Sequence, residues 1–231
     1  MLKRGTSHIE FVLAFVLFIG FLIFALMFFN PLDNARVLGS SLEYAFDEVS
    51  ESLTSELNVF SVSLKNVDPA LNLIRIPVSN EEDFNVRVLD ANNSELTSRY
   101  DFASGHVIVD RENNNFIYVL FSEDFNVGGA SGGAVVDTHE ISSSDNRKVI
   151  SEKKAVLLKG SYENNYEVLK NQMNLPGRID FSFQLTFNDG SSIIGQKNIP
   201  GGLEVESRRE RVETIRENGG IEFADLIVKV W

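Results

Sequence analysis

The hydrophobic and polar positions divide the chain into an apolar segment, a segment of helical periodicity and a long region of alternating residues. The apolar segment is an uncharged run from Phe11 to Phe29. At a rise of about 1.5 Å per residue, this run would form a helix of about 28 Å, close to the hydrocarbon thickness of a bilayer. The pattern therefore predicts a transmembrane helix over residues 6–30.

Helical periodicity returns after Pro31. Apolar residues recur at steps of three and four, with acidic and serine residues between them: Leu38, Leu42, Phe46, Val49, Leu53, Leu57 and Phe60. This spacing predicts an amphipathic helix within residues 31–60. Its apolar stripe either covers the core of the next domain or also packs, in its lower part, against other subunits. Pro31 either kinks one continuous helix or precedes a second helix that starts at Asp33.

Beyond Phe60 the apolar residues alternate with a period of two, which predicts strands. The expected strands are 74–78, 84–88, 116–121, 179–187, 203–215 and 221–231. Pro77 favours an edge position for the first, and the continuous apolar run 116–121 favours a central position. Asn188-Asp189-Gly190 predicts a hairpin turn, and residues 161–173 predict a short amphipathic helix.

The predicted fold class is therefore α+β, with a long N-terminal transmembrane and amphipathic helix followed by an antiparallel β-rich globular head over residues 61–231. The net charge of −12 argues against a nucleic-acid partner, because phosphate binding requires a basic surface. The chain has no cysteine, so disulfides, thiolate nucleophiles and cysteine metal sites are excluded.

The residues before the apolar run carry the most specific motif. Lys3, Arg4 and Gly5 precede it, and Glu10 lies at its threshold. This segment resembles the class III signal of type IV pilins and archaeal pilin-like proteins, in which a basic residue and glycine precede the scissile bond and glutamate follows five residues later. The resemblance implies cleavage between Gly5 and Thr6 by the class III prepilin peptidase. Residues 1–5 would then be a cleaved signal, and the apolar helices would bundle as a filament core.

A secretory signal peptide is the first rival interpretation. The apolar run is longer than the about 7–15 residues of a typical signal core, and no small-residue cleavage site follows it. A plain signal anchor remains open. Lys3 and Arg4 favour a cytoplasmic N-terminus, so the expected location is the cell membrane, single-pass, with the C-terminal domain extracellular.

A carboxylate at the edge of an apolar helix is costly unless it finds a partner. Cleavage after Gly5 would expose a new α-ammonium on Thr6, and Glu10 could pair with it. The pair could form within one chain at i,i+4 spacing or with a neighbouring subunit, which would fix the axial stagger of a filament.

Two segments suggest enzymatic or metal chemistry. Residues 129–133 fit the G-x-S-x-G pattern around Ser131, but a strand-like segment follows and no later histidine completes a triad. Asp137, His139 and Glu140 could place two ligands on one strand face, but a metal site needs further ligands from elsewhere. We therefore expect no catalytic residue, no metal and no cofactor.

Two further surface features have alternative interpretations. Asn92 begins an N-x-S sequon in a polar loop and is a candidate glycosylation site. The arginines of residues 208–216 alternate with glutamates, which fits either a solvated hairpin or a contact with the acidic helix of a neighbouring subunit.

The sequence predicts a pilin-like structural subunit of an archaeal type IV-type surface filament or envelope assembly, which polymerises through its N-terminal apolar helix. A C-terminal apolar strand, 226–231, agrees with this resemblance. The expected partners are other pilin subunits, the class III prepilin peptidase, the filament assembly machinery and the membrane. The alternative is a monomeric, bitopic, membrane-anchored extracellular binding protein, and the third hypothesis is an exterior hydrolase that uses Ser131.

Overall fold

The structure, a computed structural model, describes residues 6–28, 32–65, 67–78, 84–136, 139–217 and 219–231. These residues form four helices: α1 (Thr6–Phe28), α2 (Leu32–Leu53), α3 (Glu152–Asn164) and α4 (Tyr166–Gln172). They also form thirteen strands: β1 (Thr54–Leu64), β2 (Leu73–Ile76), β3 (Asn85–Asp90), β4 (Glu95–Leu96), β5 (Ser98–Asp101), β6 (His106–Asp110), β7 (Phe116–Ser122), β8 (Ala134–Val135), β9 (His139–Ser151), β10 (Phe181–Thr186), β11 (Ser192–Gly195), β12 (Glu206–Ile215) and β13 (Ile221–Val230).

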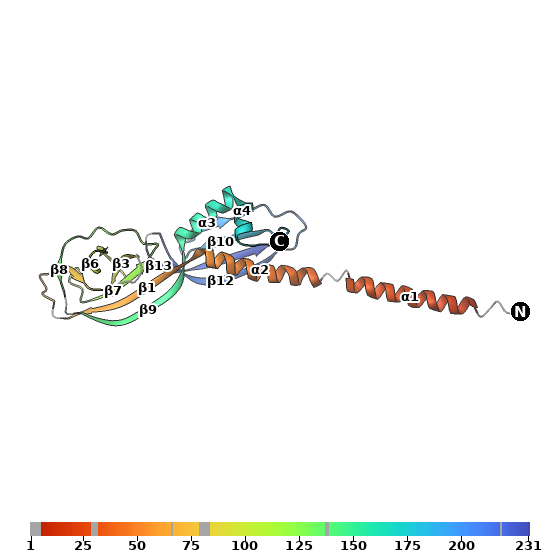
Figure 1. The fold of residues 1–231 in the computed structure, drawn as a ribbon, viewed down its shortest axis with the longest axis horizontal. Coiled ribbons are helices and arrows are strands. Elements are labelled where there is room, and N and C mark those ends of the chain that lie inside the picture. Colours follow the sequence, from red (N-terminus) through yellow and green to blue (C-terminus); the bar gives the residue numbers. More distant parts are fainter. Residues whose placement is uncertain (1–5, 29–31, 66, 79–83, 137–138, 218) are drawn as a thin grey trace.

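The strands form two sheets. The larger has nine strands in the order β11-β10-β13-β12-β9-β1-β7-β3-β4, and the smaller has the order β5-β6-β2-β8. Most neighbours are antiparallel, but β12 pairs with β9 and β2 with β8 in parallel, each over two residue pairs. Strands β1 and β9 run along the β-rich body and connect its two ends (Figure 1).

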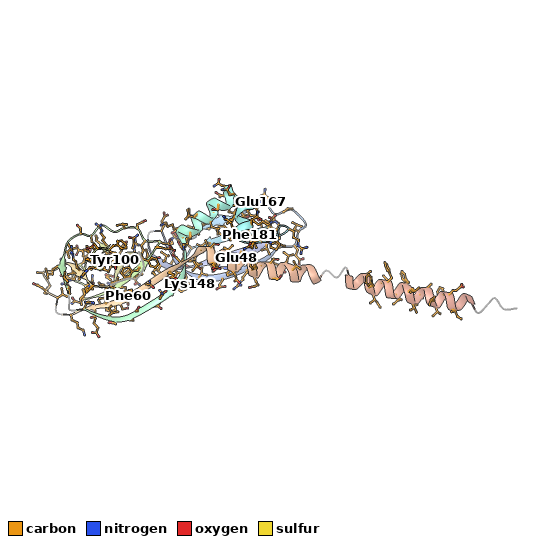
Figure 2. The ribbon with its side chains drawn as sticks, in the orientation of Figure 1. Glu48, Phe60, Tyr100, Lys148, Glu167 and Phe181 are labelled. Carbon is orange, nitrogen blue, oxygen red and sulfur yellow. The ribbon has the colours of Figure 1, made fainter. Side chains whose placement is uncertain are left out.

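Each end of the β-rich body has its own hydrophobic core. The first core lies between α2, α3, α4 and strands β10 and β13, and contains Phe46, Leu53 and Phe181. The second lies between the small sheet and the far part of the large sheet, and contains Ile74, Tyr100 and Phe121. Figure 2 shows Phe181 and Tyr100 at opposite ends of the β-rich body. A smaller third cluster, around Leu57, Leu120, Phe125, Val149 and Ile215, lies on the large sheet.

The predicted pilin-like fold class is wrong. More of the described residues lie in strands than in helices, and none of the described helices is long and apolar enough to span a membrane. The sheet is also mixed rather than purely antiparallel. Pro31 lies outside the described residues.

The expected amphipathic helix ends earlier than its apolar spacing predicts. Helix α2 stops at Leu53, and Leu57 and Phe60 belong to β1. The reason is tertiary: β1 pairs with β9 on one side and with β7 on the other, so both rows of its backbone groups are satisfied in a sheet. Leu57 and Val62 are then fully buried in different clusters.

Several strand predictions are confirmed. Strand β7 lies between β1 and β3, as the apolar run 116–121 predicts. Strands β10 and β11 form a hairpin around Asp189 and Gly190, and the φ of Gly190 is 84°. Strands β12 and β13 form the C-terminal hairpin.

Two local predictions are wrong. Pro77 does not mark an edge strand, because β2 ends at Ile76 and lies between β6 and β8. The helix expected over 161–173 is two helices, α3 and α4, separated at Asn165, and α3 begins much earlier. Its N-cap is Ser151, whose hydroxyl accepts a hydrogen bond from the Lys154 amide at 3.1 Å.

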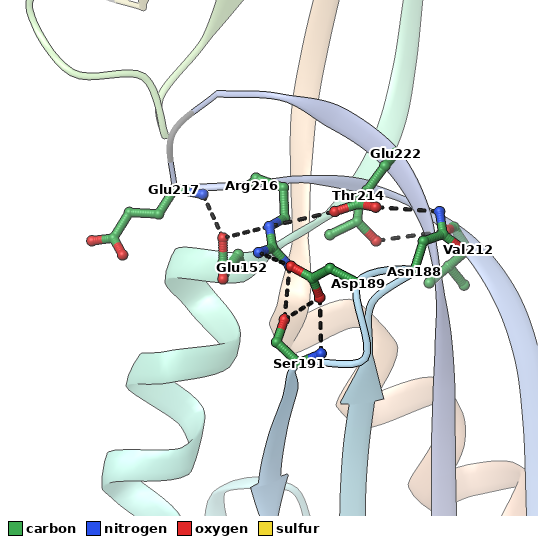
Figure 3. A network of polar contacts seen from close by, with 9 residues as sticks. All are labelled: Glu152, Asn188, Asp189, Ser191, Val212, Thr214, Arg216, Glu217 and Glu222. Carbon is green, nitrogen blue, oxygen red and sulfur yellow. Dashed lines mark hydrogen bonds and ion pairs between the residues drawn. The ribbon is translucent and has the colours of Figure 1, made fainter.

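A polar network joins the start of α3 to two hairpins. The Arg216 guanidinium lies 3.3 Å from Glu152, 3.1 Å from Asp189 and 3.4 Å from Glu222 (Figure 3). It also stacks over the ring of Phe187 at 3.8 Å. Because Arg216 is largely buried, this network fixes how α3 sits on the large sheet.

Candidate functional site

Helix α1 carries the most unusual surface of the chain. The helix has no internal proline, and its leucine, alanine and methionine residues favour helical conformation. Large apolar side chains project from it in every direction, since consecutive residues are about 100° apart around the axis. We call them the α1 apolar surface: Ile9, Phe11, Val12, Leu13, Phe15, Val16, Leu17, Phe18, Ile19, Phe21, Leu22, Ile23 and Phe24.

All members of the α1 apolar surface are exposed, Phe11 to 73% and Phe15 to 56%. An apolar helix of this kind is normally buried on all sides, because each exposed large side chain forgoes about 1.5–3 kcal/mol of burial. The surface therefore requires something to cover it.

Among the described residues, no helix is both long enough and apolar enough to cross a bilayer. This finding contradicts the transmembrane helix expected over residues 6–30. It also contradicts the single-pass membrane location with an extracellular C-terminal domain.

The structure does not bring the predicted processing and pairing residues together. Lys3, Arg4 and Gly5 lie outside the described residues, and α1 begins at Thr6. Glu10 is exposed in α1, and no described side chain forms an ion pair with it. Cleavage after Gly5 and the pairing of Glu10 with a Thr6 ammonium stay predictions.

Helix α2 is fastened to the sheet of its own chain. The guanidinium of Arg208 on β12 pairs with Glu43 of α2, lies 3.9 Å from Asp47 and sits 4.0 Å above the ring of Phe46. The sequence left open whether this arginine cluster contacts a neighbouring acidic helix, and the structure places the contact of Arg208 within one chain. Only tertiary folding brings β12 beside α2, so the Arg208–Glu43 pair cannot be predicted from local sequence patterns.

Arg209, the next residue, lies on the opposite face of β12. It donates a hydrogen bond of 2.6 Å to Asp225 on β13 and thereby lowers the pKa of this carboxyl below its usual range. Successive arginines of β12 thus serve different partners.

The G-x-S-x-G segment lies in the loop between β7 and β8, with Ser131 exposed. The loop follows a strand, but no helix follows it, so it lacks the local geometry of a nucleophile elbow. The Nε of Arg75 donates a hydrogen bond of 2.9 Å to the carbonyl of Gly132, which ties this loop to the small sheet.

The other candidate residues are dispersed. His139 and Glu140 begin β9, Glu140 pairs with Lys65, and Asp137 lies outside the described residues. Within the described part of the chain, no group of three or more metal-ligating side chains occurs. Asn92 is exposed in the turn between β3 and β4. Its backbone N–H donates a hydrogen bond of 2.8 Å to the Asp90 carboxylate.

Comparison with known proteins adds no family. No family model, curated protein or solved structure matches this chain. Only the residues of this chain itself therefore indicate its function.

Proposed function

We propose that this chain is a structural subunit of a filament or related assembly, in which the α1 helices of several copies pack against one another. The observation that carries this proposal is the α1 apolar surface, which is exposed around the whole helix. The resemblance of the N-terminal segment to type IV pilins supports the same role, because those helices form a filament core.

The energies are sufficient for such packing. Burial of a large apolar side chain contributes about 1.5–3 kcal/mol, whereas association costs about 4–15 kcal/mol. Five or six side chains of the α1 apolar surface would therefore offset the cost, and the surface has thirteen. Helix α2 is attached to the sheet of its own chain through Arg208 and Glu43, whereas the large apolar side chains of α1 are exposed.

The test compares charged substitutions on α1 with the same substitutions elsewhere. Full-length Phe15→Glu and Phe18→Glu place a carboxylate on the α1 apolar surface. Val127→Glu and Leu157→Glu are controls, because both side chains are exposed, at 67% and 65%, on other elements. Light scattering should show multimers for the wild type and both controls, and smaller species for the α1 variants.

Electron microscopy of the same samples separates ordered assembly from aggregation. We expect regular filaments from the wild type and none from the α1 variants. A monomeric wild type would refute the proposal. Equal loss in all four variants would show that the association is not specific to α1.

Glu10→Gln tests the role of the charge at the start of α1. If Glu10 pairs with the Thr6 ammonium of another copy, the amide cannot replace the carboxylate, and crosslinking should recover fewer multimers. Identical crosslinked ladders from wild type and Glu10→Gln would remove Glu10 from the assembly contact.

A further inference from the structure

The large sheet is apolar on both faces where β1, β3 and β7 lie side by side. One face contributes Val88 and Val119 to the second core. On the other face, Leu89 and Tyr118 pack against the third cluster and stay partly exposed. A sheet that packs on one face normally alternates with polar residues on the other, so the second apolar face needs a separate explanation.

A cavity of about 650 Å³ lies over this second face. Its apolar lining includes Val59, Leu89, Leu120 and Ile221. Pockets for small ligands typically measure about 300–1,000 Å³ and combine apolar walls with a few polar groups. The cavity has the size and the lining of a small-ligand site.

A glycine turn forms one wall of the cavity. Gly219 lies between β12 and β13 with a φ of 80°, and a Cβ there would lie 2.0 Å from the Cζ of Arg87. The positive φ favours glycine here, and a larger residue would also require the Arg87 side chain to move. The C-terminal hairpin thus supplies one wall of the cavity, and β3, far away in the sequence, supplies another.

The charges around the cavity are matched. Arg87 pairs with Glu95 at 3.1 Å. Arg147 pairs with Asp145 at 2.6 Å and with Glu213 at 2.8 Å. Both guanidinium groups have carboxylate partners, so the charges of the cavity wall are balanced and favour an uncharged ligand. The buried Nε of Arg147 has no hydrogen-bond partner among the described residues.

Two polar groups of the lining keep free hydrogen-bonding capacity. Among the described residues, neither the hydroxyl of Tyr118 nor the side-chain amide of Asn93 has a hydrogen-bond partner. A suitable ligand must therefore combine hydroxyl or carbonyl groups with an apolar face. A pyranose ring has both, since its C–H groups cover an apolar floor while its hydroxyls reach the rim.

We propose that this cavity binds one pyranose residue of a neutral glycan. Tyr118 and Asn93 donate and accept hydrogen bonds with its hydroxyls, and the side chains of Val59, Leu89 and Leu120 contact its C–H face. The site is separate from α1, so this inference does not depend on assembly.

Saturation-transfer difference NMR on the full-length chain tests the site with glucose, galactose, mannose and N-acetylglucosamine. At least one sugar should receive saturation. Tyr118→Phe and Asn93→Gly should each weaken its binding about fivefold, the factor that one typical net hydrogen bond gives. Glycine suits position 93 because Asn93 has a φ of 63°.

Matched controls make the same changes away from the cavity. Tyr44→Phe alters an exposed tyrosine of α2, and Asn113→Gly alters another asparagine with positive φ, 66°. Both should bind as the wild type does. No transfer to any of the four sugars, tighter binding of glucuronate, or unchanged affinity in Tyr118→Phe and Asn93→Gly would each overturn the proposal.

The sugar has two potential sources, because the sequon asparagine Asn92 directly precedes Asn93. The experiment compares sugar binding by three samples: the chain produced with N-glycosylation, the chain produced without it, and the Asn92→Gln variant. A glycan of Asn92 that fills the cavity should block added sugar only in the first arm. A glycan from another molecule predicts equal binding in all three, and failure of all three overturns the site.

Discussion

Arg216, directly after β12, and Glu152, at the start of α3, form an ion pair, with Nε 3.3 Å from Oε2. Glu152 also accepts a hydrogen bond of 2.6 Å from the backbone amide of Glu217. The carboxylate lies in the first turn of α3, where the helix dipole favours negative charge. One acidic side chain thus connects the helix to the C-terminal hairpin.

Replacement of Arg216 by methionine should lower the free energy of unfolding by about 2 kcal/mol. The change leaves three carboxylates close together without their cation, in a largely buried setting. Urea denaturation measures the effect. Arg178→Met, at an exposed loop position, is the control and should change stability by less than about 0.5 kcal/mol.

The addition of one methyl group should affect two adjacent glycines very differently. A Cβ at Gly128 would lie 1.7 Å from the carbonyl oxygen of Ser98, whereas a Cβ at Gly129 would have no neighbour within 4 Å. Gly128→Ala should therefore destabilise the fold by about 1–3 kcal/mol, the range for overpacking. Gly129→Ala should be nearly neutral, and equal melting temperatures for the two variants would contradict the packing of this loop.

Asp180 should make stability depend on pH at the acid end. Burial alone would raise its pKa, but hydrogen bonds from Tyr166 and Lys170 and the charges of Lys170 and Lys197 together lower it. A lowered pKa stabilises the fold above the unfolded value of about 3.9, and this contribution is lost as pH falls through the folded value.

Asp180→Asn should cost about 2 kcal/mol at pH 7, because it leaves the ammonium of the buried Lys170 without its carboxylate. The difference from wild type should shrink as the pH falls below about 4. Denaturation midpoints between pH 2 and 7 measure it, with Glu51→Gln as an exposed control. A constant difference across this range would be inconsistent with the lowered pKa.

The two ends of the chain should differ in their importance for folding. Deletion of residues 1–31 removes exposed apolar side chains, so the remainder should unfold cooperatively and give circular dichroism with more strand than helix. Deletion of residues 221–231 removes β13, which lies between β10 and β12 and contributes Leu226, Val228 and Val230 to the first core. Loss of cooperative unfolding is expected only for the second deletion.

Processing is tested by mass spectrometry of the N-terminus in cells that contain the class III peptidase. The motif Lys3-Arg4-Gly5 predicts a mature chain that begins at Thr6. Replacement of Gly5 by a bulky residue should block the cut. An intact Met1 in the wild type would refute the resemblance on which the cut depends.

Local sequence patterns were sufficient to predict the elements in which the spacing of apolar side chains and the turn residues both indicate the same structure. Strand β7 is a continuous apolar run, and the β10–β11 hairpin has an Asp-Gly turn. Strand β9 escaped prediction, because its residues from Glu140 to Asn146 are all exposed and mostly polar. Its position is fixed by backbone pairing with β1, which leaves no trace in hydrophobic spacing.

The sequence by itself determined that α1 is an apolar helix, that the remainder is rich in strands and that the motif around Gly5 and Glu10 is the candidate for processing and pairing. Tertiary structure alone decided that α2 ends at Leu53 and that Arg208 binds Glu43 of its own chain. It also placed Asn93 and Gly219 at one cavity. The physical reason is range: periodicity and turns depend on neighbouring residues, whereas ladders, ion pairs and cavities depend on segments that only folding brings together.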